Sequence, residues 1–449
     1  MNDTPATSDF DVVVVGGGTA GVVAAIAAGR SGARTLLVEA SGNLGGNAAV
    51  GMTFGGFHDI DRRQVIQGIP EEIVQRCMAL GGRGHVTIDS DDIWISTKAS
   101  ADSETVKFVC AEMVTEAGVT VWLRSSLLEV ETDDAGRVTA IDVVCKSGRI
   151  RITARMFVDT SGDGDLAAGA GAQFERGGGD RQQLISTMFR VGNVDVEALE
   201  NYMNTVINVD GKDPWRAESA FLRGSHEYWL PWKFDPAADH FPRTFGVYHH
   251  GTEGDLVINA VGVPGNGLDV TSLSAAEIEL RKQSTELFWW LRDNAPGFEK
   301  SYLSQVYPVG VRESRRIIGE HQVTLEDMMA GVVYPDTVAM GAYPPDLHDA
   351  KSGSVHISKD DNRAYALPLG AMIPTGLANV IVAGRCISAT FDAESGLRGI
   401  GPSMALGQAA GTAAALAALD NGSVTALDVV RLQDRLRQDG AFLPDALVT

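Results

Sequence analysis

A glycine-rich turn between an apolar strand and a small-residue helix is the most constraining feature of the sequence. Residues 11–15 read DVVVV, and Gly16, Gly18 and Gly21 follow with the spacing G-x-G-x-x-G, before the small apolar residues 22–29. In this spacing the first glycine permits a tight turn, the second lets a phosphate approach the backbone, and the third lets helix and strand pack closely. The helix N-terminus then attracts the anion. The stretch therefore predicts a dinucleotide site.

A second apolar run and a second glycine loop follow at the distance that a dinucleotide-binding unit requires. Residues 35–38 form the run, and Glu39 at its end lies 21 positions after Gly18. At that spacing the carboxylate is expected to accept hydrogen bonds from ribose hydroxyls. The next loop carries Gly45 and Gly46, which could meet the phosphates or the ribityl chain of a bound flavin. The alternative is a flexible surface loop.

The composition is typical of a large globular protein, and its net negative charge disfavours binding to polyanions. The chain has 449 residues, 44% of them apolar, and a net charge of −21. The length predicts two joined domains, and the charge argues against nucleic acid and anionic membranes as partners. No window of about 18 residues lacks polar groups, so no membrane span is expected. The N-terminus lacks the regions of a signal peptide, and four scattered cysteines offer neither a C-x-x-C pair nor a zinc spacing. These features predict a cytoplasmic protein without a metal site.

Residues 70–165 are predicted to form two helices and a β-meander that returns to the nucleotide site. The helices are expected at 70–80 and 104–117, and the strands at 119–123, 127–132, 138–145, 149–153 and 156–159. The last strand enters the sequence FVDTSGDGD, which brings Ser161, Gly162 and Asp163 to the edge where open α/β sheets bind ligands. A calcium loop is the rival interpretation, but its later glutamate is missing.

From about residue 176 the sequence predicts an inserted domain. Residues 180–345 lack glycine turns of the nucleotide type and are rich in aromatic side chains, which more often form core than pocket. Antiparallel strands are expected at 245–249 and 256–261, and a helix at 274–294 with Ser274 as its N-cap. We therefore expect an α/β fold: a Rossmann-like nucleotide-binding domain with a parallel sheet and β-meander, plus an inserted α+β substrate domain. The expected boundaries are 1–175 and 371–449 for the first domain and 176–370 for the second.

The segment 309–320, VGVRESRRIIGE, concentrates three arginines. On the helix expected there, Arg312 and Arg316 share one face. Such fixed guanidinium groups could bind a substrate carboxylate or stabilise negative charge on a reduced flavin ring. The alternative is an internal ion-pair network. Of the three, Arg312 is our candidate for orienting an anionic group.

Three histidines are candidates for handling a proton, in the order His58, His348, His250. His58 lies between glycines near a cofactor loop, where it could donate a proton or tether a cofactor covalently; a surface histidine is the competing explanation. His348 follows Asp346 by two residues, which makes a candidate acid/base pair on a loop. His250 belongs to the aromatic, histidine-rich block of the inserted domain.

The C-terminal part is expected to return to the cofactor. An apolar strand at 380–382 precedes a turn with Gly384, and SGLRGIG leads into a helix at 404–419 that is dense in alanine and glycine. Pro402 suits the first helical turn. Gly407 and Gly411 belong to a slim face that favours close packing of another backbone.

Taken together, these motifs resemble the FAD-dependent oxidoreductase family of the glutathione-reductase-like FAD superfamily, which includes many uncharacterised bacterial proteins. The matching stretches are VVVVGGGTAGVVAAIAAGRSGARTLLVE, GGNA, FVDTSGDGDLA, GVRESRRIIGEH, YPPDLH, NVIVAGRCISA and GPSMALGQAAGTAAA. They span nearly the whole chain and specify the family and FAD, but no substrate.

The resemblance implies which residues surround the FAD. Those expected near the adenine end and along the chain of the cofactor are Gly16, Gly18, Thr19, Ala20, Gly21, Glu39, Ala40, Gly45, Gly46, Asn47, Ser161, Gly162 and Asp163. Those expected to close over the flavin are Gly384, Arg385, Gly401, Ser403 and Met404.

Features that are missing from the sequence narrow the chemistry. There is no second dinucleotide fingerprint, no C-x-x-C pair, no iron–sulfur spacing and no Gly-Asp-Ala motif of flavin hydroxylases. We therefore expect an FAD enzyme that transfers a hydride between a small organic substrate and the flavin, with an unidentified electron acceptor. A flavin monooxygenase or oxidase that uses oxygen, or an electron-transfer flavoprotein, is the alternative. Neither nucleic acid nor membrane is an expected partner, whereas a second copy in a homodimer remains open.

Overall fold

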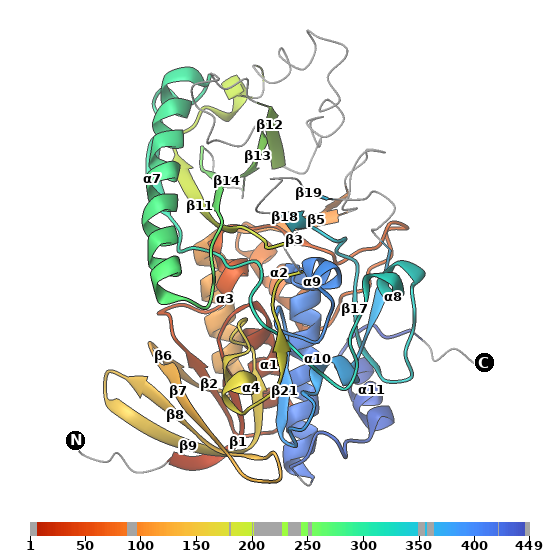
Figure 1. Cartoon of the computed structure of the whole chain (residues 1–449). Helices are drawn as coiled ribbons and strands as arrows, with labels where there is room; N and C mark the ends of the chain where they lie inside the picture. Colours follow the sequence, from red (N-terminus) through yellow and green to blue (C-terminus); the bar gives the residue numbers. More distant parts are fainter. Residues whose placement is uncertain are drawn as a thin grey trace.

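The computed structural model shows a layered α/β body joined to a second antiparallel sheet (Figure 1). It describes residues 7–87, 97–178, 181–199, 201, 227–231, 244–249, 254–348, 355–356, 363–420 and 422–444. Within these ranges, no helix combines the length and the apolar character needed to cross a membrane.

The first sheet has the order β6-β2-β1-β9-β8-β7, with β21 pairing to β9 as well. Strand β1 (Thr7–Val15) lies between β2 (Thr35–Glu39) and β9 (Gly148–Asp159) and is parallel to both. Strand β21 (Val380–Val382) pairs in parallel with the end of β9, although more than two hundred residues separate them. The expected Rossmann-like parallel sheet is confirmed, and its last strand comes from the C-terminal part of the chain.

The β-meander is also confirmed, with one correction. Strands β6 (Thr120–Leu123), β7 (Ser126–Thr132) and β8 (Val138–Cys145) lie where they were expected. The two predicted strands at 149–153 and 156–159 are one continuous strand, β9. Its first half pairs antiparallel with β8, and it also pairs in parallel with β1, so the same strand serves the meander and the parallel sheet.

Helices α1 (Thr19–Arg30) and α10 (Ile400–Leu419) pack against each other over the first sheet. A Cβ atom on Gly407 would overlap the carbonyl oxygen of Ala20, and one on Gly411 would overlap that of Ala24. Only glycine permits this approach of two backbones, so the small-residue face of α10 is a helix-packing face. Helices α2 (Ile69–Ala79) and α3 (Ser103–Glu116) lie within one residue of their predicted bounds.

The second sheet has the order β12-β13-β14-β11-β15 and is antiparallel throughout. Its strands are β11 (Ile185–Gly192), β12 (Glu227–Pro231), β13 (Thr244–His249), β14 (Leu256–Val263) and β15 (Tyr302–Val306). Helix α7 (Val270–Asn294) packs on β11 and β14, and with them it encloses a separate hydrophobic core (Figure 1).

One expectation for the inserted part is wrong, the start of its helix, whereas the expected domain boundaries stay a prediction. Helix α7 begins at Val270 rather than at residue 274, because the Asp269 carboxylate accepts from the Ser272 N–H and so caps an earlier turn. The second core ends at about residue 309, and Ile317 already belongs to the first core. Most of the chain between there and residue 370 therefore packs with the nucleotide-binding part.

The segment 309–320 is not the helix that was expected there. It runs through irregular backbone into the short strand β16 (Arg316–Ile317), which pairs with β10 (Phe174–Glu175). The remaining elements are η1 (Gly46–Val50), β3 (Phe54–Gly55), β4 (Arg83–Thr87), β5 (Thr97–Ser100), α4 (Asp165–Gly169), α8 (Leu325–Ala330), β17 (Thr337–Gly341), β18 (Leu347–His348), β19 (Val355–His356), β20 (Tyr365–Pro368), η4 (Leu369–Met372), α9 (Phe391–Leu397) and α11 (Val429–Gln438).

Candidate functional site

A cleft runs between the two sheets, at the carboxyl ends of β1, β9 and β21. On the side of the first sheet, the lining residues come from the segments 18–20, 46–53, 160–162 and 383–385 and from the start of α10. From the second sheet it is lined by residues 186–188, Tyr248 and Asn259. The segment 307–312, the residues around 346 and Arg398 close its far end.

The three glycines of the first turn differ in the space around them. Gly16 has φ +98°, and a Cβ there would lie 2.5 Å from the Thr160 carbonyl oxygen; a Cβ on Gly21 would overlap the carbonyl oxygen of Gly16. A Cβ on Gly18 would meet nothing within 4 Å, and Gly18 lines the cleft. Gly18 is also the N-cap of α1, which has no side-chain cap. Tight packing at two glycines and open space at the middle one match the three roles expected from the spacing.

The second glycine loop lies directly against the first. The Gly45 N–H donates to the Gly17 carbonyl at 2.9 Å, and the Thr19 hydroxyl donates to the Gly45 carbonyl at 3.1 Å. Gly46 and Asn47 line the cleft, as do Thr19 and Ala20. Gly45 does not; it packs beneath the loop, so its role is to shape the turn.

Glu39 braces the glycine turn from the end of β2. Its carboxylate accepts from the Gly17 N–H and from the Ser41 N–H, each at 2.6 Å. Neither Glu39 nor the exposed Ala40 lines the cleft. The predicted contact between Glu39 and a ribose therefore stays a prediction, while its contact with the turn is a feature of the fold.

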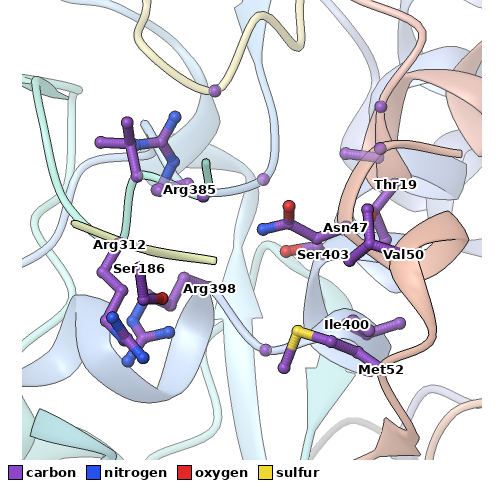
Figure 2. A pocket seen from close by; sticks show the side chains of 18 of the residues that line it. Thr19, Asn47, Val50, Met52, Ser186, Arg312, Arg385, Arg398, Ile400 and Ser403 are labelled. Atoms are coloured by element: carbon purple, nitrogen blue, oxygen red, sulfur yellow. The ribbon is translucent and has the colours of Figure 1, made fainter. Parts of the chain in front are cut away.

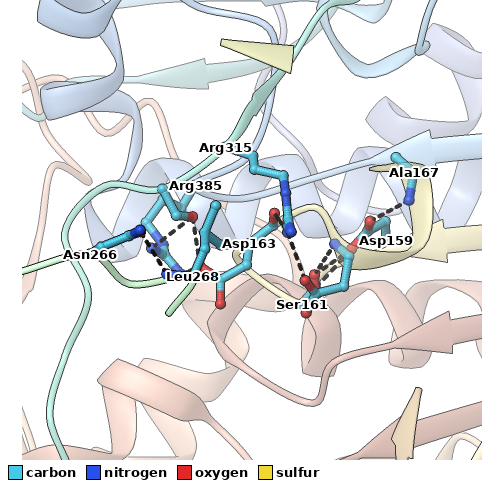
Figure 3. A network of polar contacts seen from close by, with 10 residues as sticks. Asp159, Ser161, Asp163, Ala167, Asn266, Leu268, Arg315 and Arg385 are labelled. Atoms are coloured by element: carbon cyan, nitrogen blue, oxygen red, sulfur yellow. Dashed lines mark hydrogen bonds and ion pairs between the residues drawn. The ribbon is translucent and has the colours of Figure 1, made fainter. Parts of the chain in front are cut away.

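The loop that follows β9 is held by a network of its own side chains (Figure 3). Asp159 is fully buried and accepts from the Ser161 N–H, the Ser161 hydroxyl and the Ala167 N–H, at 3.1, 2.7 and 2.9 Å. Asp163 accepts from Arg385 Nη2 at 2.9 Å and from the Ser314 hydroxyl at 2.6 Å. Ser161 and Gly162 line the cleft, whereas Asp163 does not. Asp163 acts by holding Arg385, which lines the cleft in its place.

Of the five residues that were expected to close over the flavin, only three line the cleft. Gly384, Arg385 and Ser403 line the cleft. Gly401 does not, because a Cβ there would lie 2.6 Å from the Gly55 carbonyl oxygen, and Met404 is buried in the core. Helix α10 has Gly399 as its N-cap and no side-chain cap, so a second uncapped helix N-terminus opens on the cleft.

Two arginines form a cationic end of the cleft. Figure 2 shows Arg312 and Arg398 side by side, across from Met52 and Ile400. Arg312 Nη1 donates to the Leu184 carbonyl at 2.8 Å, and among the described residues it has no ion pair. Burial and the nearby Arg398 lower the pKa of Arg312 to about 10. A partly buried guanidinium that forms no ion pair within the described part of the chain is suited to receive an anion.

Arg398 was not predicted as a site residue. Its Nη2 atom donates to the Asp346 carbonyl at 2.5 Å and to Gln183 Oε1 at 3.2 Å, and it lies 3.6 Å from Asp346 Oδ2. The signal that could have found it is its place in SGLRGIG, directly before the N-cap of α10.

His348 and Asp346 form the expected pair within the cleft. Nε2 of His348 lies 3.0 Å from Asp346 Oδ1. Burial lowers the pKa of His348 below its ordinary value, and the charge of Arg312 adds to that effect. Burial alone would raise the pKa of Asp346, but His348, Arg398 and Arg312 outweigh it and hold that pKa well below its usual range. At neutral pH the pair is therefore an aspartate beside a neutral imidazole.

The first-ranked histidine does not reach the cleft. His58 Nδ1 lies 2.7 Å from the Thr97 hydroxyl, and its ring stands 4.7 Å from that of His85, away from the lining residues. Burial, followed by the effect of His85, lowers the pKa of His58 to about 4. His58 is therefore a neutral, partly buried histidine that does not line the cleft. His250 lies outside the described residues.

The other two arginines of the 309–320 segment do not line the cleft. Arg315 pairs with Asp165 at 2.8 Å and donates to the Asp163 carbonyl (Figure 3). Arg316 is buried and donates to the carbonyls of Ala389 and Gly177. Because the segment is not a helix, the expected shared face of Arg312 and Arg316 does not exist. Arg315 and Arg316 thus belong to an internal network of polar contacts, whereas Arg312 lines the cleft, where it could bind an anion.

An apolar wall faces the cationic end. Met188, Tyr248 and Tyr307 are buried together, and Val50 and Met52 pack against them. All five line the cleft, and the wall combines the second sheet with the loop that follows the second glycine turn. The aromatic block thus contributes Tyr248 to the cleft, a contact that the composition alone could not single out.

Comparisons with known proteins identify a family. The model of the family described as FAD dependent oxidoreductase matches residues 11–436. Similar solved structures include a geranylgeranyl bacteriochlorophyll reductase-like protein from Thermoplasma acidophilum, with 14% identity, TM-score 0.46, and coverage of 96% of this chain and 84% of that one. Others are p-nitrophenol 4-monooxygenase from Pseudomonas putida (14%, 0.46, 95% and 84%) and a triple mutant of a flavin-dependent brominase (13%, 0.49, 96% and 84%).

Proposed function

This chain belongs to the FAD-dependent oxidoreductase family and is an FAD enzyme, and we propose that it transfers a hydride between the flavin and a small organic anion. The observation that carries this proposal is the partly buried Arg312, which lines the cleft without an ion pair among the described residues. We further propose that its nucleotide-binding part belongs to the glutathione-reductase-like superfamily, on the strength of the β1-α1-β2 unit and the parallel β21.

The residues of the cleft fit an FAD. Two helix N-termini without side-chain caps, those of α1 and α10, open on it. The open space at Gly18, between Thr19 and the second glycine loop, suits the pyrophosphate. Ser161, Gly162, Gly384 and Arg385 would hold the rest of the cofactor. When bound, the flavin supplies the two-electron redox chemistry, and the protein supplies binding, orientation and charge.

The cationic end and the apolar wall together define the proposed substrate. Arg312 and Arg398 would hold the anionic group by charge-assisted hydrogen bonds, with Asp346 fixing the second arginine. The wall formed by Val50, Met52, Met188, Tyr248 and Tyr307 would cover the apolar body of the substrate and exclude water from it.

His348 is our choice for the proton that accompanies the hydride. Asp346 is ionised and can only accept, so His348 Nε2 carries the hydrogen that faces it. That assignment leaves Nδ1 as the basic atom of a neutral imidazole. His348 would take the proton at Nδ1 during substrate oxidation and return it in the reverse direction.

Binding of a simple anion to the FAD-loaded enzyme tests the proposal. We expect benzoate to perturb the flavin absorption at lower concentration than its neutral analogue benzamide. Arg312→Gln should abolish this preference and leave FAD bound, and Arg312→Lys should restore it in part, because a single ammonium lacks the fork geometry. Arg292→Gln is a matched control, since Arg292 stacks on Trp289 in α7, outside the cleft lining. Equal binding of benzoate and benzamide would refute an anion site.

The electron acceptor is a separate question. Anaerobic bleaching of the flavin against a panel of organic acids would identify the reducing substrate. Exposure of the reduced enzyme to oxygen then distinguishes a dehydrogenase, whose flavin reoxidises slowly, from an oxidase or a monooxygenase that consumes oxygen. A lack of bleaching by any small molecule, with reduction only by a partner protein, would instead favour an electron-transfer flavoprotein.

A further inference from the structure

A buried carboxyl group lies behind the cationic end and takes no part in the chemistry described above. Glu394 lies in α9 and is only 1% exposed. Its Oε2 atom accepts from Gln183 Nε2 at 3.2 Å, and its Oε1 atom has no hydrogen-bond partner among the described residues. Burying an ionised carboxyl group with one oxygen unpaired destabilises the folded protein, so such a group is expected to be protonated or to have a function.

Gln183 connects Glu394 to the site. Its Oε1 atom accepts from Arg398 Nη2 at 3.2 Å and from the backbone N–H of His348 at 3.4 Å. The reversed amide would turn its NH₂ group toward these two donors and leave its oxygen facing the carboxyl group. The two donors therefore select this orientation of the Gln183 amide, and Glu394 Oε2 supports it by accepting from the amide NH₂ group.

We propose that Glu394 is a positioning residue of the anion site, which holds Arg398 toward the cleft through the Gln183 amide and does so as a neutral acid. Binding of the substrate anion is then linked to the proton on Glu394. This inference rests on the proposed function, in which Arg312 and Arg398 hold an anion.

The charges around Glu394 support a bound proton. Burial raises its pKa to about 7, against the opposing effects of Arg398, Arg385 and Arg316; Glu313 acts in the same direction as burial. These groups face it from the end of α9, from the turn after β21 and from the segment that leads into β16. Asp346, His348 and Arg312 lie farther on, in the cleft.

Ionisation of Glu394 would compete with the anion for Arg398. The Nε atom of Arg398 is buried without a partner among the described residues, and it belongs to the residue four positions after Glu394. Glutamate four residues before a basic residue is the favourable helical order for an ion pair. Negative charge on Glu394 therefore weakens anion binding, and by reciprocity a bound anion favours the protonated Glu394.

The test is the pH dependence of benzoate binding to the FAD-loaded enzyme, followed by flavin absorption from pH 5.5 to 9. We expect the wild-type dissociation constant to rise as the pH passes about 7, by about fivefold or more, the size of an ordinary coupling between sites. In Glu394→Gln the amide oxygen still accepts from Gln183 Nε2, so binding should remain tight and the step near pH 7 should vanish. In Glu394→Met the acceptor is lost, so binding should be weak at every pH.

Asp392→Asn is the matched control. Asp392 lies in the same helix but forms an exposed pair with Arg181 at 2.8 Å, and its variant should keep the wild-type profile. The pKa of His348 is lower than its ordinary value, so a binding step caused by His348 would occur at lower pH than the step of Glu394. Such a step should be the same in the wild type and in the Glu394 variants.

The outcomes separate the two proposals. If wild-type enzyme does not prefer benzoate to benzamide, the anion site itself is wrong. If it does, but Glu394→Gln keeps the step near pH 7, the anion site stands and the role of Glu394 is refuted. A wild-type profile without a step in this range refutes it as well.

Discussion

Replacing Glu394 by glutamine should change how the stability of the protein depends on pH, even without substrate. Burial raises the pKa of Glu394 from 4.5 to about 7 in the folded protein, a difference worth about 3 kcal/mol. Below pH 4.5 the carboxyl group is protonated in both states and has no effect. As the pH rises to about 7, the unfolded chain releases the proton while the folded protein retains it, so the wild type loses this stability progressively. Above pH 7 the loss is constant.

Thermal unfolding of the wild type and of Glu394→Gln at pH 5 and pH 8 measures this effect. With an unfolding entropy of about 2.1 cal/mol/K per residue, 3 kcal/mol corresponds to a difference of about 3 °C in Tm for a chain of this length. We expect the Tm of Glu394→Gln, relative to that of the wild type, to be higher at pH 8 than at pH 5 by about this amount. Asp392→Asn should run parallel to the wild type. Parallel curves for wild type and Glu394→Gln would show that Glu394 has an ordinary pKa, and the reasoning from its burial would be wrong.

Two further predictions concern the glycine turn and the histidine. Gly18→Ala should fold normally but bind FAD at least tenfold more weakly, because its Cβ would meet no protein atom and would occupy the space assigned to the pyrophosphate; Gly21→Ala should lower Tm even without FAD, because its Cβ would overlap the carbonyl of Gly16. Thermal unfolding without cofactor and flavin fluorescence titrations separate the two effects. Turnover with a substrate found by anaerobic bleaching should fall as the pH drops through the lowered pKa of His348, below 6.5, because the protonated ring cannot accept at Nδ1. His348→Gln should reduce turnover and remove that limb of the rate profile, and an unchanged limb would assign the proton to another group.

The nucleotide turn could be predicted because its signals are local. An apolar run, three glycines at fixed spacing and a second run fix β1, α1 and β2 within about forty residues, and the small-residue face of α10 showed that another backbone approaches it. The helix expected at 309–320 does not form, because contacts with distant segments determine the backbone there. Pairing of β16 with β10 and the carbonyl partners of Arg316 hold the backbone extended at Arg316–Ile317. Tertiary contacts of this kind leave no local pattern.

The parts of the site that are close together in the sequence could be predicted, and the parts that are far apart could not. Asp346 and His348 are two residues apart, and their contact was expected. Arg398 reaches the same site from the C-terminal end of α9, and Glu394 acts on it through Gln183, more than two hundred positions earlier. Neither partner is visible from spacing, because the register of β11 and the packing of α9 bring them together only in the fold.

The arrangement of the cleft separates what fixes the cofactor from what selects the substrate. The residues proposed to hold the FAD belong to the first core, whereas Met188, Tyr248 and Tyr307 belong to the second sheet or to the segment that leaves it. Arg312 lies in the connection between the two cores, and its backbone partner Leu184 lies in the other connection. A change in the second sheet can therefore reshape the apolar wall while the glycine turn stays intact. The anion requirement should persist through such changes, because the two arginines are anchored by connections and helix ends rather than by the second sheet.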